Sequence, residues 1–182
     1  MANPEQLEYL QDSADDWNVY RREHAITRPD LRGADLSAAE LPGADLSGAD
    51  LAGADLRAID LTNANLANAD LTEANLSGAF LLNAVLSGAN LTGADLTGAN
   101  LTEVNAANAN LTDATLTGAI LGGANLANAD LTNAILRQAD LSEANLTSAT
   151  LLQADLTEAN LAGVDLSKAD LSWVAGLDLG GT

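Results

Sequence analysis

The residues of this sequence best suited to chemistry are carboxylates that recur at fixed spacing. In a fold that stacks positions twenty residues apart, these carboxylates would lie about 5 Å from one another, where like charges repel and a cation or hydrogen bonds would stabilise them. We interpret them as an acidic surface whose aspartates accept hydrogen bonds from the backbone beside turns. A weak divalent-cation site is the alternative. The stacked residues are Asp30, Asp50 and Asp70; Asp35 and Asp55; and Glu40 and Asp60.

Other reactive groups are few. The chain has no cysteine, which excludes disulfides, thiol nucleophiles and cysteine-ligated metals. Its one histidine, His24, follows Arg21, Arg22 and Glu23 and is interpreted as a solvated helix residue. Asn-Leu-Thr triplets such as the one that begins at Asn90 match the glycosylation sequon, but the repeat described below produces them automatically. We therefore expect no catalytic residue, no metal and no cofactor.

The charge balance limits the class of partner. The 182 residues include 26 acids against 7 lysines and arginines, a net charge of −19. Nucleic acid attracts basic surfaces, so direct binding to it is not expected. No apolar run approaches the roughly 18 residues of a membrane span, and the N-terminus lacks the basic and apolar regions of a secretion signal. The sequence predicts a soluble protein of a bacterial or similar cytoplasm, without membrane contact.

The elements that position these residues follow from an internal repeat. Every fifth residue from Leu31 to Leu171 is leucine, in 28 of 29 positions, and the exception is Ala106. A second apolar residue, usually alanine, stands two positions before each leucine. The repeating unit is Ala-(Asp/Asn)-Leu-(Ser/Thr)-(Gly/Asn/other).

This period suits neither a helix nor a flat strand. Five residues advance an α-helix by about 500°, so the leucines would cover every face. On a strand an odd period sends successive leucines to opposite faces. The period is satisfied if each unit is a short extended side followed by a corner, with both apolar residues pointing inward.

The corner residues agree with this geometry. The second residue after leucine is glycine 11 times and asparagine six times, the two residues that best tolerate positive φ. Pro42 and Gly43 fall at the two corner positions and form the typical pair of a type II turn. Coils of such sides would bury one continuous column of leucine and alanine and stack by parallel backbone pairing.

With these leucines in strict register, the sequence resembles the pentapeptide-repeat protein family over about residues 30–174. The period of five alone leaves three or four sides per coil open. The resemblance implies four sides, and thus an all-β, right-handed, quadrilateral parallel β-helix. Twenty residues per coil give about seven coils.

The ends of such a solenoid need caps. We divide the chain into an N-terminal helical cap (1–29), the β-helix (30–174) and a C-terminal cap or tail (175–182). Trp17 or Tyr20 is expected to plug the first coil. Trp173, with Val174, Leu177 and Leu179, is expected either to close the last coil or to form half of an end-to-end dimer, an arrangement that the family resemblance favours.

Two surface features point to a protein partner. Phe80, Leu82 and Val85 stand at outward positions around one corner, where the unit usually places polar residues, and Ile120 lies two coils along from Phe80. We interpret this cluster as a contact site for a partner or a second copy. The acid-poor side that carries Leu46 is flat and nearly neutral, so a homodimer through that side or through the coil ends is a second arrangement.

The leading function is therefore a non-enzymatic binding or scaffold protein. The alternative comes from the family resemblance, because some members confer quinolone resistance as acidic DNA mimics that bind a type II topoisomerase, gyrase. The net charge of residues 30–174 permits mimicry, but nine acids lie in residues 30–73 and only three in 74–129. A mimic needs a continuous acidic stripe.

Overall fold

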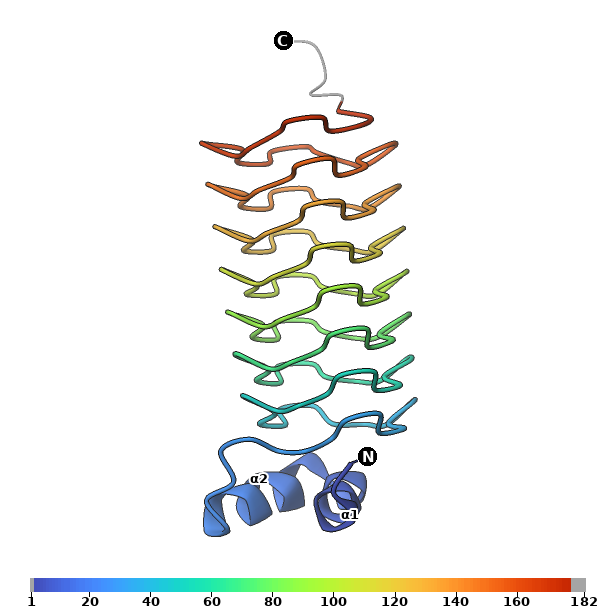
Figure 1. Cartoon of the computed structure of the whole chain (residues 1–182), viewed down its shortest axis with the longest axis vertical. Helices are drawn as coiled ribbons and strands as arrows, with labels where there is room; N and C mark the ends of the chain where they lie inside the picture. Colours follow the sequence, from blue (N-terminus) through green and yellow to red (C-terminus); the bar gives the residue numbers. More distant parts are fainter. Residues whose placement is uncertain (1, 178–182) are drawn as a thin grey trace.

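Stacked coils form a rod that stands on two short helices in the computed structural model, which describes residues 2–177 (Figure 1). Parallel β-bridges join residues twenty apart, from Asp30 and Asp50 at one end to Asp155 and Ala175 at the other, with a bridging residue at every fifth position. Each coil therefore has four sides. Within residues 2–177 every side pairs through a single bridging residue, not through a longer strand.

The two apolar residues of each unit fill the interior of the coils. The leucines from Leu31 to Leu156 are at most 3% exposed, and the alanines two positions before these leucines are similarly buried except for Ala39, which is half-buried. At the one break in the leucine pattern, Ala106 is buried beside Val104, whose larger side chain restores part of the volume. The core is one narrow column of aliphatic side chains, which explains why so few aromatic residues occur.

The corners are turns closed by a hydrogen bond between the ends of each four-residue segment. At Pro42-Gly43, the Ala44 amide donates to the Leu41 carbonyl at 3.2 Å, and Gly43 has a φ of +72°. A positive φ recurs at all 29 corners, 18 of which are not glycine. A positive φ costs roughly 1–2 kcal/mol of conformational free energy for residues other than glycine and asparagine. Hydrogen bonds to the next coil hold these corners in place, as between the Glu73 amide and the Thr92 carbonyl at 2.9 Å.

The N-terminal cap consists of α1 (Pro4–Asp12) and α2 (Ala14–Glu23). Asn3 caps α1 by accepting hydrogen bonds from the amides of Glu5 and Gln6, and Ser13 caps α2 by accepting one from the Asp16 amide at 3.1 Å. None of the helices in residues 2–177 has the length and hydrophobicity to cross a membrane.

The helices lie against the first coil (Figure 1). Their apolar residues Leu10, Ala14, Trp17 and Tyr20 belong to the same hydrophobic core as the coils. Trp17 and Tyr20, the expected plug residues, are both buried, as is Leu10. The Trp17 indole donates to the Asp45 carbonyl at 2.8 Å, and Tyr20 stacks on Tyr9 with ring centroids 3.9 Å apart.

Trp173 does not close the last coil, contrary to one of the two expectations for it. Its side chain is 83% exposed because it stands at a corner, with a φ of +60°, and corner side chains project away from the core. Val174 and Leu177 are half-buried against the core. Leu179 and the rest of the expected C-terminal tail beyond residue 177 lie outside the described residues.

Candidate protein-binding surface

Aspartate and asparagine at the bridging positions have a local structural role. In the Asp155 unit, one carboxylate oxygen accepts a hydrogen bond from the Thr157 amide at 3.0 Å and another from the Thr157 hydroxyl at 2.5 Å. The same pair of bonds joins Asp35 to Ser37 and recurs along the rod. These bonds stabilise the turn that follows, which explains the Asp/Asn and Ser/Thr preferences of the unit.

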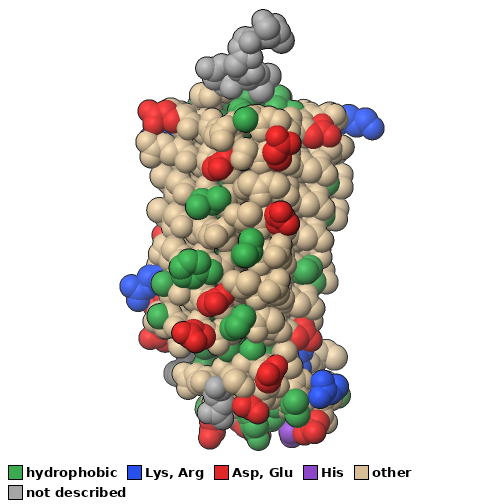
Figure 2. All heavy atoms as spheres, turned by 180° about the vertical axis from the view of Figure 1, so that it is seen from behind, with side chains coloured by type: hydrophobic (Ala, Val, Ile, Leu, Met, Phe, Trp, Pro, Cys, Tyr) green, Lys and Arg blue, Asp and Glu red, His purple; other side chains and the backbone are tan. Residues whose placement is uncertain are grey.

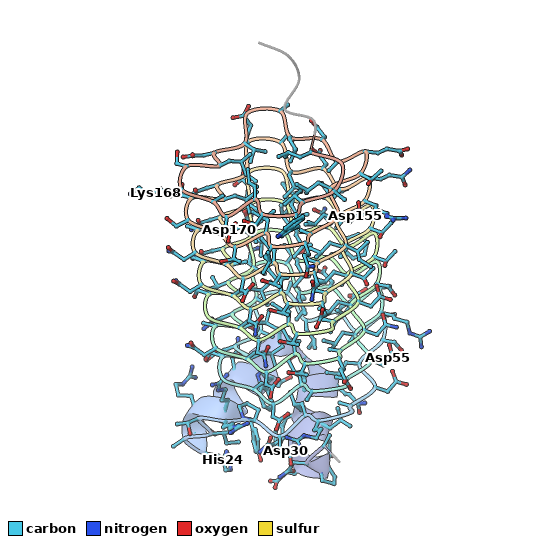
Figure 3. The ribbon with its side chains drawn as sticks, turned by 45° about the horizontal axis from the view of Figure 1, so that its top comes forward. His24, Asp30, Asp55, Asp155, Lys168 and Asp170 are labelled. Atoms are coloured by element: carbon cyan, nitrogen blue, oxygen red, sulfur yellow. The ribbon has the colours of Figure 1, made fainter. Side chains whose placement is uncertain are left out.

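The bridging acids point outward from the coils, as the labelled Asp55 and Asp155 do in Figure 3. Two of the three acidic stacks expected from the sequence hold arginines. In the stack of Asp30, Asp50 and Asp70, Asp50 pairs with Arg32 at 2.5 Å and with Arg28 at 3.6 Å. In the stack of Asp35 and Asp55, Arg57 pairs with Asp55 at 2.6 Å.

The third stack, Glu40 and Asp60, has no ion pair to any described residue. Nor does any group of three His, Asp or Glu side chains in residues 2–177 have the arrangement of a metal site. The geometry thus distinguishes three stacks that are equivalent in the sequence.

Hydrogen bonds and ion pairs lower the pKa of several of these carboxyls. The hydroxyl and amide of Thr157, together with Arg137, lower the pKa of Asp155 to about 2. Arg32 lowers the pKa of Asp50, against the opposing effect of its burial. A carboxyl whose pKa is lowered in the folded state stabilises the fold above its unfolded-state pKa of about 3.9 and loses that contribution as pH falls toward the folded value.

We expect Asp155→Asn to reduce the acid sensitivity of the rod. The asparagine oxygen still accepts the Thr157 hydrogen bonds, but the titrating charge and its ion pair with Arg137 are gone. The loss of unfolding free energy between pH 6 and pH 2.5, measured by urea denaturation, should shrink by about 1 kcal/mol after allowance for solvent screening. Asp130→Asn is the control without an arginine partner. An equal effect of both variants would contradict this prediction.

The apolar cluster expected around Phe80 is partly assembled. Phe80 is 51% exposed and Ile120 is 45% exposed, and both belong to the side of the rod that we call the Phe80 face. Leu82 and Val85 are half-buried, so they contribute less open surface than the sequence suggested. The bridging residues of the Phe80 face are Glu40, Asp60, Phe80, Asn100, Ile120, Asp140 and Asn160.

A hollow of about 320 Å³ lies on this face beside Phe80, lined also by Glu40, Asp60 and the small side chains of Ala38 and Ala58. On the face of the rod seen in Figure 2, the apolar side chains form separate green patches among polar atoms. Phe80 thus combines an exposed ring with an adjacent recess.

The acid-poor side is occupied by an amide ladder. The Asn145 amide donates to Asn125 at 3.3 Å, and the Asn125 amide donates to Asn105 at 3.1 Å. These contacts satisfy the asparagines within the rod and leave a neutral surface. His24, at the C-terminus of α2, is exposed, with its Nδ1 2.9 Å from the Tyr20 carbonyl oxygen and its ring packed on Tyr20.

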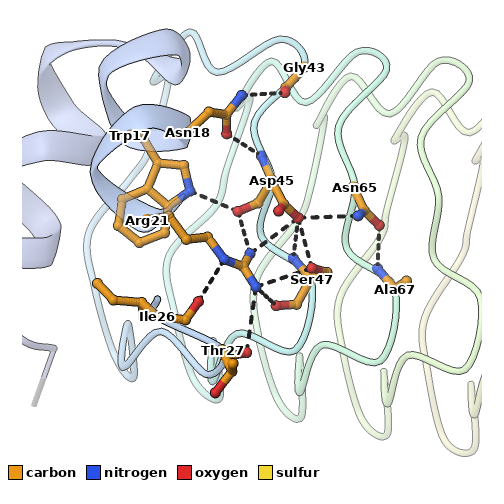
Figure 4. Close-up of polar contacts among 10 residues, drawn as sticks. All are labelled: Trp17, Asn18, Arg21, Ile26, Thr27, Gly43, Asp45, Ser47, Asn65 and Ala67. Atoms are coloured by element: carbon orange, nitrogen blue, oxygen red, sulfur yellow. Dashed lines mark hydrogen bonds and ion pairs between the residues drawn. The ribbon is translucent and has the colours of Figure 1, made fainter. Parts of the chain in front are cut away.

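Sequence reasoning missed Arg21, which joins the cap to the rod (Figure 4). Its guanidinium donates to the carbonyls of Ile26, Asp45 and Ser47 at 3.0, 2.5 and 2.5 Å, and pairs with the Asp45 carboxylate at 3.2 Å. Asn18 adds bonds to the Gly43 carbonyl and the Asp45 amide. In sequence Arg21 is one of two adjacent arginines, and the signal that distinguishes it from Arg22 is its position four residues after Trp17 and seven after Ala14, on the apolar face of the helix.

Comparison with known families agrees with the fold. The family model for pentapeptide repeats matches residues 30–68, 64–102, 109–147 and 139–174, which together span most of the rod. The chain therefore belongs to the pentapeptide-repeat family, as its sequence pattern predicted. A search of curated proteins finds no significant match.

Several solved structures are similar to this chain. HetL, a pentapeptide-repeat protein involved in heterocyst differentiation regulation in the cyanobacterium Nostoc sp. strain PCC 7120, is 41% identical over 80% of this chain and 73% of its own, with a TM-score of 0.37. Rfr23 from the cyanobacterium Cyanothece 51142 is 26% identical over 87% and 96%, with a TM-score of 0.36. Trypsin-treated QnrB1, a plasmid-mediated fluoroquinolone resistance protein, is 19% identical over 82% and 81%, with a TM-score of 0.54.

Proposed function

We propose that this chain is a non-enzymatic binding protein that holds a partner protein on its Phe80 face. The observation that carries the proposal is the exposed Phe80 ring at a position where the unit usually places a turn-stabilising Asp or Asn. A phenyl side chain cannot accept the hydrogen bond that Asp155 receives from Thr157, and half of its surface remains in water. A phenylalanine here therefore gives up the turn-stabilising hydrogen bond and keeps an apolar ring half in water, both of which reduce folding stability.

The architecture supports binding over catalysis. The interior is filled by leucine and alanine, so a rigid rod presents its chemistry only on its outer faces. An exposed aromatic ring beside a recess is the kind of anchor that dominates protein interfaces. Rigidity limits the entropy that such a surface loses when it binds.

Phe80→Asn tests this proposal because it restores the unit while it removes the anchor. A photoreactive benzoylphenylalanine in place of Phe80, used in the native host, identifies the partner. We then expect Phe80→Asn to weaken binding of the purified partner at least tenfold while the melting temperature stays equal or rises. Thr115→Asn, the same repair on another side, should leave binding unchanged. Unchanged binding with a melting temperature several degrees lower would show that Phe80 is structural and the proposal wrong.

Two other arrangements give different results in the same experiments. If the partner is a second copy, wild-type protein should self-associate in sedimentation velocity and Phe80→Asn should not. An acidic mimic would inhibit gyrase supercoiling. The likeness to QnrB1 concerns the fold alone, and the few acids in residues 74–129 interrupt the acidic stripe that mimicry needs.

A further inference from the structure

Three residues at the lower part of the Phe80 face form a continuous column. Glu40 bridges to Asp60, and Asp60 bridges to Phe80, so these side chains lie on successive coils. Neighbouring coils are about 4.8 Å apart. Two carboxylates and a phenyl ring are thus placed side by side, and all three line the same hollow.

Within the part of the chain that the structure describes, no lysine or arginine forms an ion pair with Glu40 or Asp60. Arg28 and Arg32 pair with Asp50 in the first acidic stack. Arg57, whose chain position is nearest to Asp60, instead makes two bonds to the Asp55 carboxylate, from Nε at 2.8 Å and from Nη2 at 2.6 Å. Among the described residues, the stack of Glu40 and Asp60 is the one pair of bridging acids on successive coils that lies in a column without an arginine.

We propose that the hollow beside Phe80 receives an arginine side chain from the partner protein, with its guanidinium between Glu40 and Asp60 and its plane against the Phe80 ring. This inference rests on the proposed function and names the chemistry of the partner. In the other two acidic stacks the cation comes from the rod itself, since Arg32 pairs with Asp50 and Arg57 pairs with Asp55. On the Phe80 face the partner supplies the missing cation.

The chemistry of the hollow selects arginine over other cations. A guanidinium is planar, pairs with carboxylates through a fork of N–H donors and stacks on aromatic faces, whereas an ammonium is a more strongly hydrated point charge. The small side chains of Ala38 and Ala58 leave room beside the ring for the arginine stem. A divalent cation would gain nothing from Phe80.

A small probe tests the pocket without knowledge of the partner. Nα-acetyl-arginine amide is titrated into ¹⁵N-labelled protein, with the neutral isostere Nα-acetyl-citrulline amide as the matched control. We expect saturable amide shifts at Asp60 and Phe80 at millimolar arginine probe and none with citrulline. The double variant Glu40→Gln with Asp60→Asn should weaken probe binding at least fivefold, and the asparagine still accepts the hydrogen bond of the Thr62 amide.

Asp35→Asn is the control on a stack that already holds Arg57, and it should leave probe binding unchanged. Three results would overturn the inference: shifts spread equally over all acids of the rod, shifts unaffected by the double variant, or competition by millimolar Mg²⁺ that abolishes them, which would indicate a metal site.

The identified partner then separates this inference from the proposed function. We expect the double variant to weaken partner binding at least fivefold and to reduce its dependence on salt. If Phe80→Asn abolishes partner binding but the double variant has no effect, the Phe80 face is an interface and the arginine inference is wrong. If Phe80→Asn has no effect on partner binding, the proposed function itself is wrong, whatever the probe does.

Discussion

Leu96→Ala is expected to lower the free energy of unfolding by about 2–5 kcal/mol. Leu96 is fully buried in the middle of the rod. Removal of its side chain loses apolar burial and leaves a cavity. The surrounding leucines cannot move in to fill it, because hydrogen bonds to the coils on both sides fix the backbone of each coil, as between the Leu96 amide and the Thr115 carbonyl at 2.7 Å.

The natural break in the leucine pattern supplies the control. Val104 and Ala106 are buried on the same side of one coil. The double variant Val104→Ala with Ala106→Leu keeps the summed side-chain volume similar and restores the unit, so it should change stability by less than about 1.5 kcal/mol. Urea denaturation followed by circular dichroism measures both variants.

A solenoid adds a further consequence to the Leu96→Ala cavity. Each coil contacts only its neighbours, so a weakened interface in the middle can separate the unfolding of the two halves. We expect a lower denaturant slope or two transitions in Leu96→Ala but not in the control. A cost near zero with an unchanged slope would show that the leucine register has been misassigned.

The sequence predicted the rod because one unit is repeated so many times. Each leucine in register is an independent observation of the same inward position, and Pro42-Gly43 fixes the corners without reference to the leucines. The turn-stabilising role of the bridging aspartates could also be predicted, since Asp and Asn bind backbone amides two residues on. The core and the corners could be predicted because each five-residue unit contains its own inward apolar residues, its corner residue and its turn-stabilising Asp or Asn.

The structure was needed for two kinds of feature: the direction in which long side chains turn, and the packing at the two ends of the rod. Nothing in the sequence shows that Arg57 turns toward Asp55 and leaves Asp60 without a cation, because both acids are within its reach. The outward direction of Trp173 follows from its corner position, which the apolar character of the residue obscured. Leu82 and Val85 stand at outward positions but are half-buried, so their positions in the repeat predicted more exposed surface than these side chains have.

The first coil depends on Arg21 in a way that no repeat position does. Inside the rod, a carbonyl such as that of Asn65 accepts a hydrogen bond from the amide of the preceding coil, here from Leu46 at 2.7 Å. The Asp45 and Ser47 carbonyls have no preceding coil on this side. In place of amides from a preceding coil, the Arg21 guanidinium donates hydrogen bonds to both carbonyls, and the Trp17 indole donates a further one to the Asp45 carbonyl.

Arg21→Met is therefore expected to destabilise the protein by about 2–3 kcal/mol, because the Ser47 carbonyl loses its guanidinium donor and Asp45 loses its ion pair, keeping only its hydrogen bonds from Trp17, Ser47 and Asn65. Methionine keeps much of the aliphatic volume, so the loss reports on the hydrogen bonds and charge. The neighbouring Arg22 is exposed, and Arg22→Met should cost less than 0.5 kcal/mol. Hydrogen exchange should show faster exchange of the α2 amides and of Leu46 in the first variant only. If both variants cost the same, α2 is held by its apolar side chains alone and the guanidinium has no special role.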